Sequence, residues 1–452
     1  MNTEEKDVIN ERPAEEFTSG EKTHIPESGT GGDKPPKKAE SSTKKAVKIS
    51  VFAAIIASLL LAVLVSQITF LAVSHKYEKL LASMQGGQAE NGLDLPLLKE
   101  LDELYRQYYV GEITEEQLEY MIMQGYVAGT GDVYGNYMSK DEYKEYYSSL
   151  NSSLVGIGVN VLWSEKDMSI EILRVFPDSP AEKGGLQHGD MIIAVDGVSV
   201  KELGYDAAVD AIKGEIGTKV NITVTRNGEE MTFTCTRDTV NVLTVNTKVI
   251  DGNIGYISIS NFYAETPNEV KAAVEAHIAA GCDRLIFDMR NNTGGLLNSV
   301  EATLDYLLPE GVIVRFMNDR NETVSDPYIS DKSSVDLPMT IIVNEYSASA
   351  AELFTSTIMD FADMGKADAT VIGTQTYGKG TVTRGYPLSD GSVIWISVER
   401  YCPPVSDNFE GVGITPDIVL ELSDEAKKIS LYKLTYEQDT QLQKAVEEVK
   451  KK

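Results

Sequence analysis

The sequence predicts an α/β domain with an inserted β-rich module, amino-terminal helices and one membrane-spanning helix. Three observations carry this prediction. An uncharged run at residues 49–73 is long enough to cross a bilayer. Short strand patterns separated by glycine turns follow from Val155. From Asn246 onward, strand and helix patterns alternate, as they do in α/β domains.

Length and charge limit the classes of function. The chain has 452 residues, which is enough for two or three domains. Asp and Glu total 69 against 41 Lys and Arg, so the net charge is −28. Nucleic acid is excluded as a partner because its phosphates would be repelled. The cysteines are far apart and form no CxxC pair, so we expect at most one disulfide and no metal site. They are Cys235, Cys282 and Cys402.

The amino-terminal region predicts a membrane anchor. Residues 1–48 are polar and rich in Glu, Lys, Pro, Ser and Gly, which indicates a disordered tail. Six lysines between Lys34 and Lys48 precede the apolar run at 49–73. The positive-inside rule therefore places the tail in the cytoplasm and everything from Ser74 outside it, in a single-pass protein of the cell membrane. A cleaved signal peptide is the alternative, but the run exceeds a signal core and lacks a clear Ala-x-Ala exit.

Helical patterns flank the folded domains. A polar stalk and a helical region are expected at residues 74–150, with helical spacing at 93–109, 114–128 and 139–148. Helices this short are marginal alone and must dock against other elements. Residues 425–452 are expected to form a carboxyl-terminal helical tail.

A glycine motif opens the β-rich module. In VGIGVN, which begins at Val155, the backbone N–H groups of Gly156, Ile157, Gly158 and Val159 can converge on a carboxylate. The strand that follows can accept an added peptide strand through main-chain hydrogen bonds. A side chain at Gly158 is expected to crowd this nest. The alternative is a β domain with ordinary glycine turns.

A second motif contains two serines at a tight turn. The stretch NEYSASAAELF follows a strand pattern at Met339–Val343 and leads into a helix pattern at Ala350–Met359. Ser347 or Ser349 is therefore either a nucleophile or a helix cap. The usual proton acceptor is histidine, but the chain has few histidines and none in a suitable motif. His277 is expected at the surface of a helix. The histidines are His24, His75, His188 and His277.

A lysine can replace histidine as the base where burial disfavours its charged form. Lys379 lies between Gly378 and Gly380 in TYGKGTV, and its alternative is a solvated lysine in a surface turn. The Gly294 and Gly295 pair in DMRNNTGGL can aim a backbone N–H at a developing oxyanion. Taken alone, this pair is an ordinary turn.

In order and combination, these motifs resemble the carboxyl-terminal processing (tail-specific) serine–lysine peptidases. The resemblance covers residues 93–422 and includes DMRNNTGG, NEYSASAAE, TYGKGTV, GYPLSDGS and GVGITPDIV. Residues 152–238 resemble a PDZ domain, and 239–424 would form the serine peptidase domain. The resemblance implies a crotonase-like core and a protein or peptide substrate with an accessible carboxyl-terminal tail. It also implies a homodimer formed through the amino-terminal helices.

The resemblance assigns roles to individual residues. Ser349 takes the position of the nucleophile and Lys379 that of the general base. The oxyanion donors would be the backbone N–H groups of Ala350 and of Gly294 or Gly295. No cofactor or metal is implied.

One departure leaves two functions open. Four positions after Lys379 the family commonly has a glutamine that orients the lysine, and this chain has Thr383. The first function is a membrane-anchored serine endopeptidase that acts outside the cytoplasm. The second is a catalytically inactive relative that tethers a partner through its PDZ domain. A trypsin-like PDZ protease is excluded by the lack of a suitably placed histidine.

Overall fold

The computed structural model describes residues 95–452. Helix α2 (Pro96–Tyr108) belongs to one compact unit and Glu115–Lys452 to another, so α2 is described by itself. It contains no buried residue. Within the described range, no helix is long and apolar enough to cross a membrane. The predicted tail and anchor, residues 1–48 and 49–73, lie outside the described residues.

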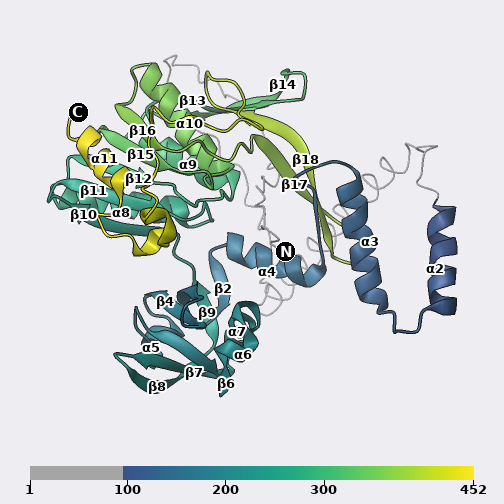
Figure 1. Cartoon of the computed structure of the whole chain (residues 1–452). Coiled ribbons are helices and arrows are strands. Elements are labelled where there is room, and N and C mark those ends of the chain that lie inside the picture. Colours follow the sequence, from purple (N-terminus) through teal and green to yellow (C-terminus); the bar gives the residue numbers. More distant parts are fainter. Residues whose placement is uncertain (1–94) are drawn as a thin grey trace, which may run out of the picture. The chain divides into compact units, whose positions relative to one another are not determined.

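A six-stranded sheet forms the centre of the α/β domain (Figure 1). All neighbouring strands are parallel except β10 and β11. In spatial order they are β10 (Val245–Ile250), β11 (Ile254–Ile259), β12 (Arg284–Asp288), β15 (Met339–Val343), β16 (Ala369–Gly373) and β19 (Ile418–Val419). Because parallel strands end at the same edge, the segments that follow β12, β15 and β16 meet there. The predicted α/β alternation is confirmed, and the crotonase-like relation stays a prediction.

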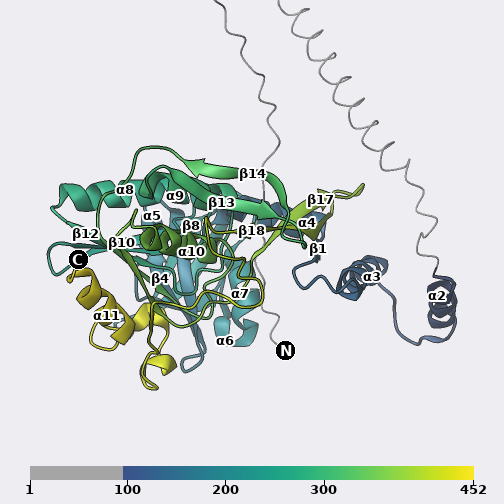
Figure 2. The same ribbon diagram turned by 90° about the horizontal axis from the view of Figure 1, so that it is seen from above.

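Helices cover both faces of this sheet (Figure 2). On one face lie α8 (Thr266–Ala279), α9 (Leu297–Leu307) and α10 (Ala350–Asp363). On the other lies α11 (Thr440–Val449), within the predicted carboxyl-terminal tail, which also contains η1 (Ala426–Lys428) and η2 (Leu431–Lys433). Burial on both faces explains why strands such as MTIIV are continuously apolar. The strand residues packed against α11 are Ile254, Ile286, Ile342 and Ile372.

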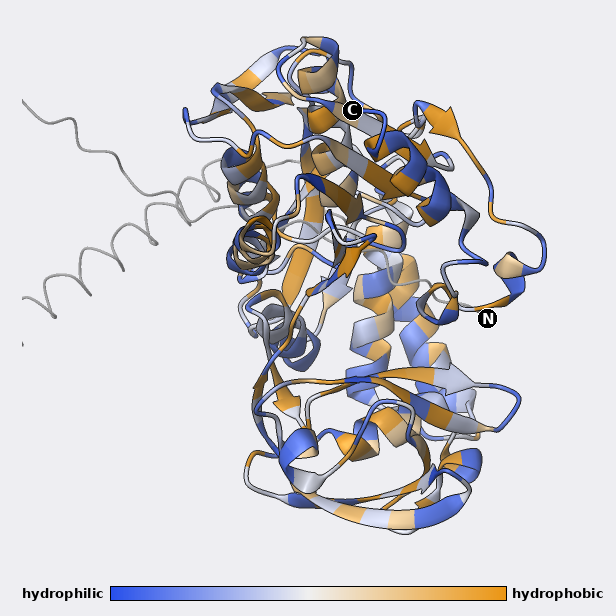
Figure 3. Cartoon of the chain, turned by 90° about the vertical axis from the view of Figure 1, so that its left-hand side faces the viewer, coloured by the Kyte–Doolittle hydropathy of each residue, from blue (hydrophilic) through white to orange (hydrophobic). Residues whose placement is uncertain are grey.

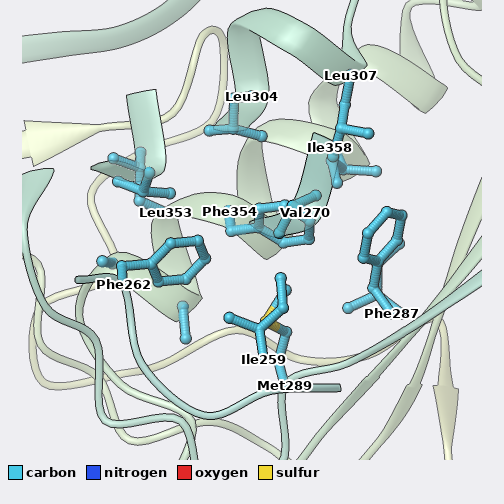
Figure 4. Close-up of a cluster of buried hydrophobic side chains, with 14 of the residues drawn as sticks. Ile259, Phe262, Val270, Phe287, Met289, Leu304, Leu307, Leu353, Phe354 and Ile358 are labelled. Carbon is cyan, nitrogen blue, oxygen red and sulfur yellow. The ribbon is translucent and has the colours of Figure 1, made fainter. Parts of the chain in front are cut away.

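An aromatic contact fixes α10 over the sheet. Phe354 of α10 lies between Phe262 and Phe287, with ring centroids 5.9 and 5.5 Å away (Figure 4). Such pairs add about 0.5–1.5 kcal/mol beyond the burial of their area. Hydrophobic residues, orange in Figure 3, are prominent in the strands of this core. The first turn of α10 is therefore held rigidly at the sheet edge.

An antiparallel sheet, which the sequence patterns did not predict, joins the amino-terminal region to the α/β domain. Strand β1 comes from that region, between α3 (Glu115–Gly129) and α4 (Lys140–Leu150), and pairs with β18. Strand β17 pairs with the other side of β18. The strands are β1 (Asn136–Met138), β18 (Val393–Cys402), β13 (Gly311–Met317), β14 (Thr323–Ser330) and β17 (Thr381–Pro387). The segment from α3 to α4 is thus attached through strand pairing, as expected, whereas docking of α2 stays a prediction.

The β-rich domain runs from β2 (Ser153–Gly156) to β9 (Asp238–Asn241), slightly beyond its predicted end at Asp238. Its main sheet has the order β3–β4–β5–β7–β8, with β6 on β5. Within the described chain β3 pairs only with β4, so one edge of β3 is open to an added strand. The elements are β3 (Val159–Ser164), β4 (Ser169–Val175), α5 (Pro180–Gly184), β5 (Met191–Val195), β6 (Val198–Ser199), α6 (Val200–Leu203), α7 (Tyr205–Ile212), β7 (Lys219–Arg226) and β8 (Glu229–Thr236).

Candidate active site

Ser349 lies at the turn between β15 and α10, in a strained backbone conformation. Its φ is 60° and its ψ is −119°, which is unusual for any residue other than glycine. The serine is fully buried among the described residues. Its N–H donates to Glu352 Oε2 at 2.8 Å, and its carbonyl accepts the Glu352 N–H at 2.9 Å. Strain that the surroundings hold in place at a strand-to-helix turn is typical of a functional residue.

The hydroxyl of Ser347 is occupied by backbone groups. Ser347 Oγ donates to the Met289 carbonyl at 2.8 Å and accepts the Asn344 N–H at 2.9 Å. These bonds join the serine turn to the segment after β12. The structure therefore places Ser347 as a turn residue.

Two backbone N–H groups, one next to Ser349 in the chain and one in the glycine pair, are the candidate oxyanion donors. Within residues 95–452, neither the Ala350 N–H nor the Gly295 N–H donates to a protein acceptor. The Gly294 N–H donates to Asn292 Oδ1 at 2.9 Å, so the open N–H of the glycine pair belongs to Gly295. A Cβ on Gly294 would lie 2.8 Å from the Cβ of Ser349, which shows how closely the pair packs on the serine turn.

Lys379 is buried in the loop between β16 and β17. Lys379 is only 2% exposed, which excludes the alternative of a solvated surface lysine. Two carboxylates hold this loop by its backbone. Glu352 accepts the N–H of Gly378 at 2.6 Å, and Glu410 accepts the N–H of Gly380 at 2.8 Å. The glycines allow these close approaches without a side chain in the way.

One carboxylate joins the serine and the lysine. Glu352 Oε2 accepts the N–H of both Ser349 and Lys379, each at 2.8 Å, while Oε1 accepts the Thr376 hydroxyl at 2.6 Å. Burial raises the pKa of Glu352, and these hydrogen bonds oppose the rise. Because a single oxygen binds both backbone nitrogens, the serine turn and the lysine loop are held as one unit.

Tyr401 of β18 contacts both Ser349 and the lysine loop, although no sequence motif indicated it. Its hydroxyl donates to the Lys379 carbonyl at 2.6 Å and lies 3.3 Å from Ser349 Oγ. Burial raises the pKa of Tyr401 well above its usual value, so the phenol stays protonated. It can therefore steady the serine hydroxyl and the lysine loop together. Tyr401 lies outside the recognised motifs, on a strand of the unpredicted antiparallel sheet.

Thr383, the predicted orienter of Lys379, is fully buried on β17. The pairing of β17 with β18 shifts register between Val382 and Thr383, which marks a local irregularity. The structure thus puts Thr383 on the strand that leaves the lysine loop. Its orienting role stays a prediction.

The expected surface position of His277 is wrong. His277 is 4% exposed, because α8 packs this face against the sheet. Its Nε2 is hydrogen-bonded with Thr247 Oγ1, and its Nδ1 lies 3.9 Å from Cys282 Sγ. Burial lowers the pKa of His277. Both ring nitrogens are engaged away from Ser349, so this histidine is a structural residue. Residues 95–452 contain no cluster of His, Cys, Asp and Glu able to hold a metal ion.

A groove of about 360 Å³ lies beside the glycine motif, between the β-rich domain and helix α4. Its walls are the loop at 156–159, strand β3, helix α7 and helix α4. Ile157 contributes through its backbone, since its side chain is 2% exposed in the domain core. The expectation for Gly158 needs correction. A Cβ there would lie 2.4 Å from the Cβ of Ser179, so a side chain would disrupt the loop itself. At Gly156, by contrast, an added Cβ would meet no atom within 4 Å.

Comparisons with known proteins identify the family of the chain. Residues 253–420 match the model of peptidase family S41, and residues 148–225 match the PDZ domain. A probable CtpA-like serine protease of Staphylococcus haemolyticus is 30% identical over 400 residues, which cover 87% of this chain and 78% of that protein. The carboxy-terminal processing protease CtpA of Bacillus subtilis is 30% identical over 332 residues, 73% of this chain and 70% of that protein. A solved structure of a putative S41 protease from Bacteroides fragilis matches with a TM-score of 0.53 and 15% identity. The match covers 80% of this chain and 98% of that one, and it supports the fold alone.

Proposed function

Because the chain belongs to peptidase family S41 and is a serine-type peptidase, we propose a specific activity for it. It is a membrane-anchored endopeptidase that uses Ser349 as nucleophile and Lys379 as base. Its substrates would be proteins outside the cytoplasm with accessible carboxyl-terminal tails. The observation that carries the proposal is the single Glu352 oxygen that binds the backbone N–H of both residues at 2.8 Å. It holds nucleophile and base in one preorganised unit, as efficient catalysis requires.

The proposed reaction follows from the positions of these groups. The neutral amine of Lys379 accepts the Ser349 proton as Oγ attacks the peptide carbonyl. The N–H groups of Ala350 and Gly295 stabilise the oxyanion that forms. The intermediate collapses, and the Lys379 ammonium protonates the leaving amine. Water then hydrolyses the acyl-enzyme, again with Lys379 as base. Thr383 would orient the amine.

The test is labelling with a fluorophosphonate probe followed by mapping of the modified peptide. We expect one phosphonylated residue, Ser349, because the probe reacts only with an activated serine beside an oxyanion site. A chain that neither labels nor cleaves any tail peptide would favour the inactive tether instead.

The groove supports recognition of a substrate tail by the PDZ domain. The open edge of β3 can pair with an extended peptide, and the loop at 156–159 can receive its carboxylate. We expect Gly156→Phe to weaken the binding of tail peptides by at least about tenfold, because Gly156 lines the groove and a Cβ there meets no atom within 4 Å. Peptide titration followed by fluorescence anisotropy measures the affinity.

Two controls separate groove obstruction from unfolding. Val198→Phe places the same ring at an exposed site of the same domain, on β6, outside the groove, and should leave the affinity unchanged. Fluorophosphonate labelling of Gly156→Phe should persist, because Ser349 and its turn are untouched. Wild-type affinity in Gly156→Phe would remove this loop from tail recognition.

The membrane proposal rests on the sequence of the uncharged run at 49–73 and the lysines before it. Protease added to cells stripped of any outer barrier should degrade the part of the chain after Ser74 and spare residues 1–48. Protection of the carboxyl-terminal part would contradict this topology. The exposed apolar side chains of α2 support the proposed homodimer, and light scattering that shows only monomer would count against it.

A further inference from the structure

Tyr134 brings the amino-terminal region into contact with the candidate base. It lies in the loop between α3 and β1 and is 9% exposed. The centroid of its ring lies 5.0 Å from Lys379 Nζ. The sequence motifs did not indicate this residue, which is far from Lys379 along the chain. Its ring therefore forms one wall of the lysine pocket.

Two carboxylates hold the ring in place. The Tyr134 hydroxyl donates to Glu410 Oε1 at 2.6 Å, and the other oxygen of Glu410 accepts the Gly380 N–H at 2.8 Å. The phenol and the lysine loop thus share one carboxylate. On the other side, Asp132 accepts the N–H of Tyr134 at 3.1 Å and that of Ser397 in β18 at 2.8 Å. The ring is in place only when this loop is docked on β18.

We propose that Tyr134 is a positioning residue that excludes water from the Lys379 amine, so that Lys379 acts as a base only when the amino-terminal region is docked. The proposal rests on the proposed function of Lys379. It makes the loop before β1 a required part of the active site, although this loop lies outside both regions matched by the family models. Undocking of this loop would then switch the enzyme off without any change in Ser349.

Two effects of the ring oppose each other. Its face attracts a cation, which favours the ammonium form of Lys379. Its bulk keeps water away, which disfavours that form, and the loss of hydration generally outweighs one cation–π contact. Exclusion of water should therefore dominate. The other titratable groups around this pocket are Glu352 on α10, Glu410 after β18, Tyr401 on β18 and Tyr377 in the lysine loop. All of them stay in place in the variants below.

The experiment measures the rate of fluorophosphonate labelling of the full chain as a function of pH. In Tyr134→Ala, the hydrated amine holds its proton to higher pH, so the rising part of the profile should move to higher pH. The rate at neutral pH should fall about 10–100-fold and recover in alkali. Tyr134→Leu keeps an apolar cover and should keep the profile near its wild-type position. Tyr134→Phe keeps the ring and should lose less rate than Tyr134→Ala.

Tyr137→Ala is the matched control. Tyr137 lies in β1, is 7% exposed and packs its ring on Tyr120, 5.8 Å away. This change should lower the unfolding temperature and leave the profile where it is. If Tyr134→Ala does not fold, Tyr134→Gln takes its place, because glutamine keeps most of the volume but presents a polar amide. The rising part of its pH profile must then move to higher pH in the same way.

Separate outcomes would overturn the two proposals. A Tyr134→Ala enzyme that loses rate equally at every pH, as a purely structural change does, would overturn the role of Tyr134. Failure of the wild type to label at any pH would instead overturn the proposed function of Ser349 and Lys379. A labelled wild type with an unshifted Tyr134→Ala profile leaves the peptidase mechanism standing and removes only the water-excluding role.

Discussion

Ser349→Ala is expected to abolish peptide cleavage and fluorophosphonate labelling. The loss in kcat should be of the order of 10⁶-fold, the size found when the nucleophile of subtilisin is removed. The neighbouring hydroxyl cannot take over, because Ser347 Oγ is held by the Met289 carbonyl and the Asn344 N–H. Cleavage of a tail peptide, followed by mass spectrometry, measures the result. The fold should survive, since the backbone bonds of Ser349 to Glu352 do not need its hydroxyl.

Ser347→Ala is the matched comparison two residues away. It leaves the buried Met289 carbonyl and Asn344 N–H without their side-chain partner, which should cost about 1–3 kcal/mol of stability. Activity per folded molecule should remain substantial, because Glu352 still holds the nucleophile turn. An inactive Ser347→Ala beside an active Ser349→Ala would reverse the assignment of the nucleophile.

The sequence motifs were informative where one short segment carries both the turn and its chemistry. A strand pattern, small residues and a helix pattern marked the turn with Ser347 and Ser349, and the family resemblance selected Ser349. Lys379 could be selected because its flanking glycines resemble those of a known family. Neither pattern could show burial, which depends on segments far away in the chain. The structure supplies it, with Lys379 2% exposed.

Residues contributed by distant elements could not be predicted in this way. Tyr401 and Tyr134 reach the site from β18 and from the loop before β1, and both depend on the pairing of β1 with β18, which no sequence motif indicated. The preference for Gly295 over Gly294 as the candidate oxyanion donor was equally beyond the sequence. It depends on the Asn292 side chain, which accepts the Gly294 N–H.

For Gly158, the structure changes the reason why a side chain would be harmful. A positive φ of 81° and the contact with Ser179 make this glycine necessary for the fold of the loop. The motif alone suggested that it was needed for space in the nest. A nest motif therefore predicts the backbone path, whereas the neighbour that a new side chain would meet is a tertiary property.

Lys379→Arg is expected to be as inactive as Lys379→Ala. A proton acceptor must be neutral, and the guanidinium group stays charged at any pH at which the protein is folded. Burial disfavours the charged form of an amine, and the Lys379 residue is 2% exposed. The wild-type rate should therefore be low where the amine is protonated and rise with pH as the proton leaves. General-base contributions are typically about 10²–10⁴-fold, so both variants should lose at least this much.

The comparison of arginine with alanine decides between a base and a fixed positive charge. If Lys379 served only to stabilise negative charge, Lys379→Arg would keep much of the rate and Lys379→Ala would not. Thr383→Val provides a graded control, because it removes a buried hydroxyl from β17 with little change in shape and should cost part of the rate if Thr383 orients the amine. Rates for wild type and the three variants on one tail peptide, measured across pH, separate these cases. An active Lys379→Arg enzyme would rule out proton transfer to Lys379, even if Ser349 were confirmed as the nucleophile.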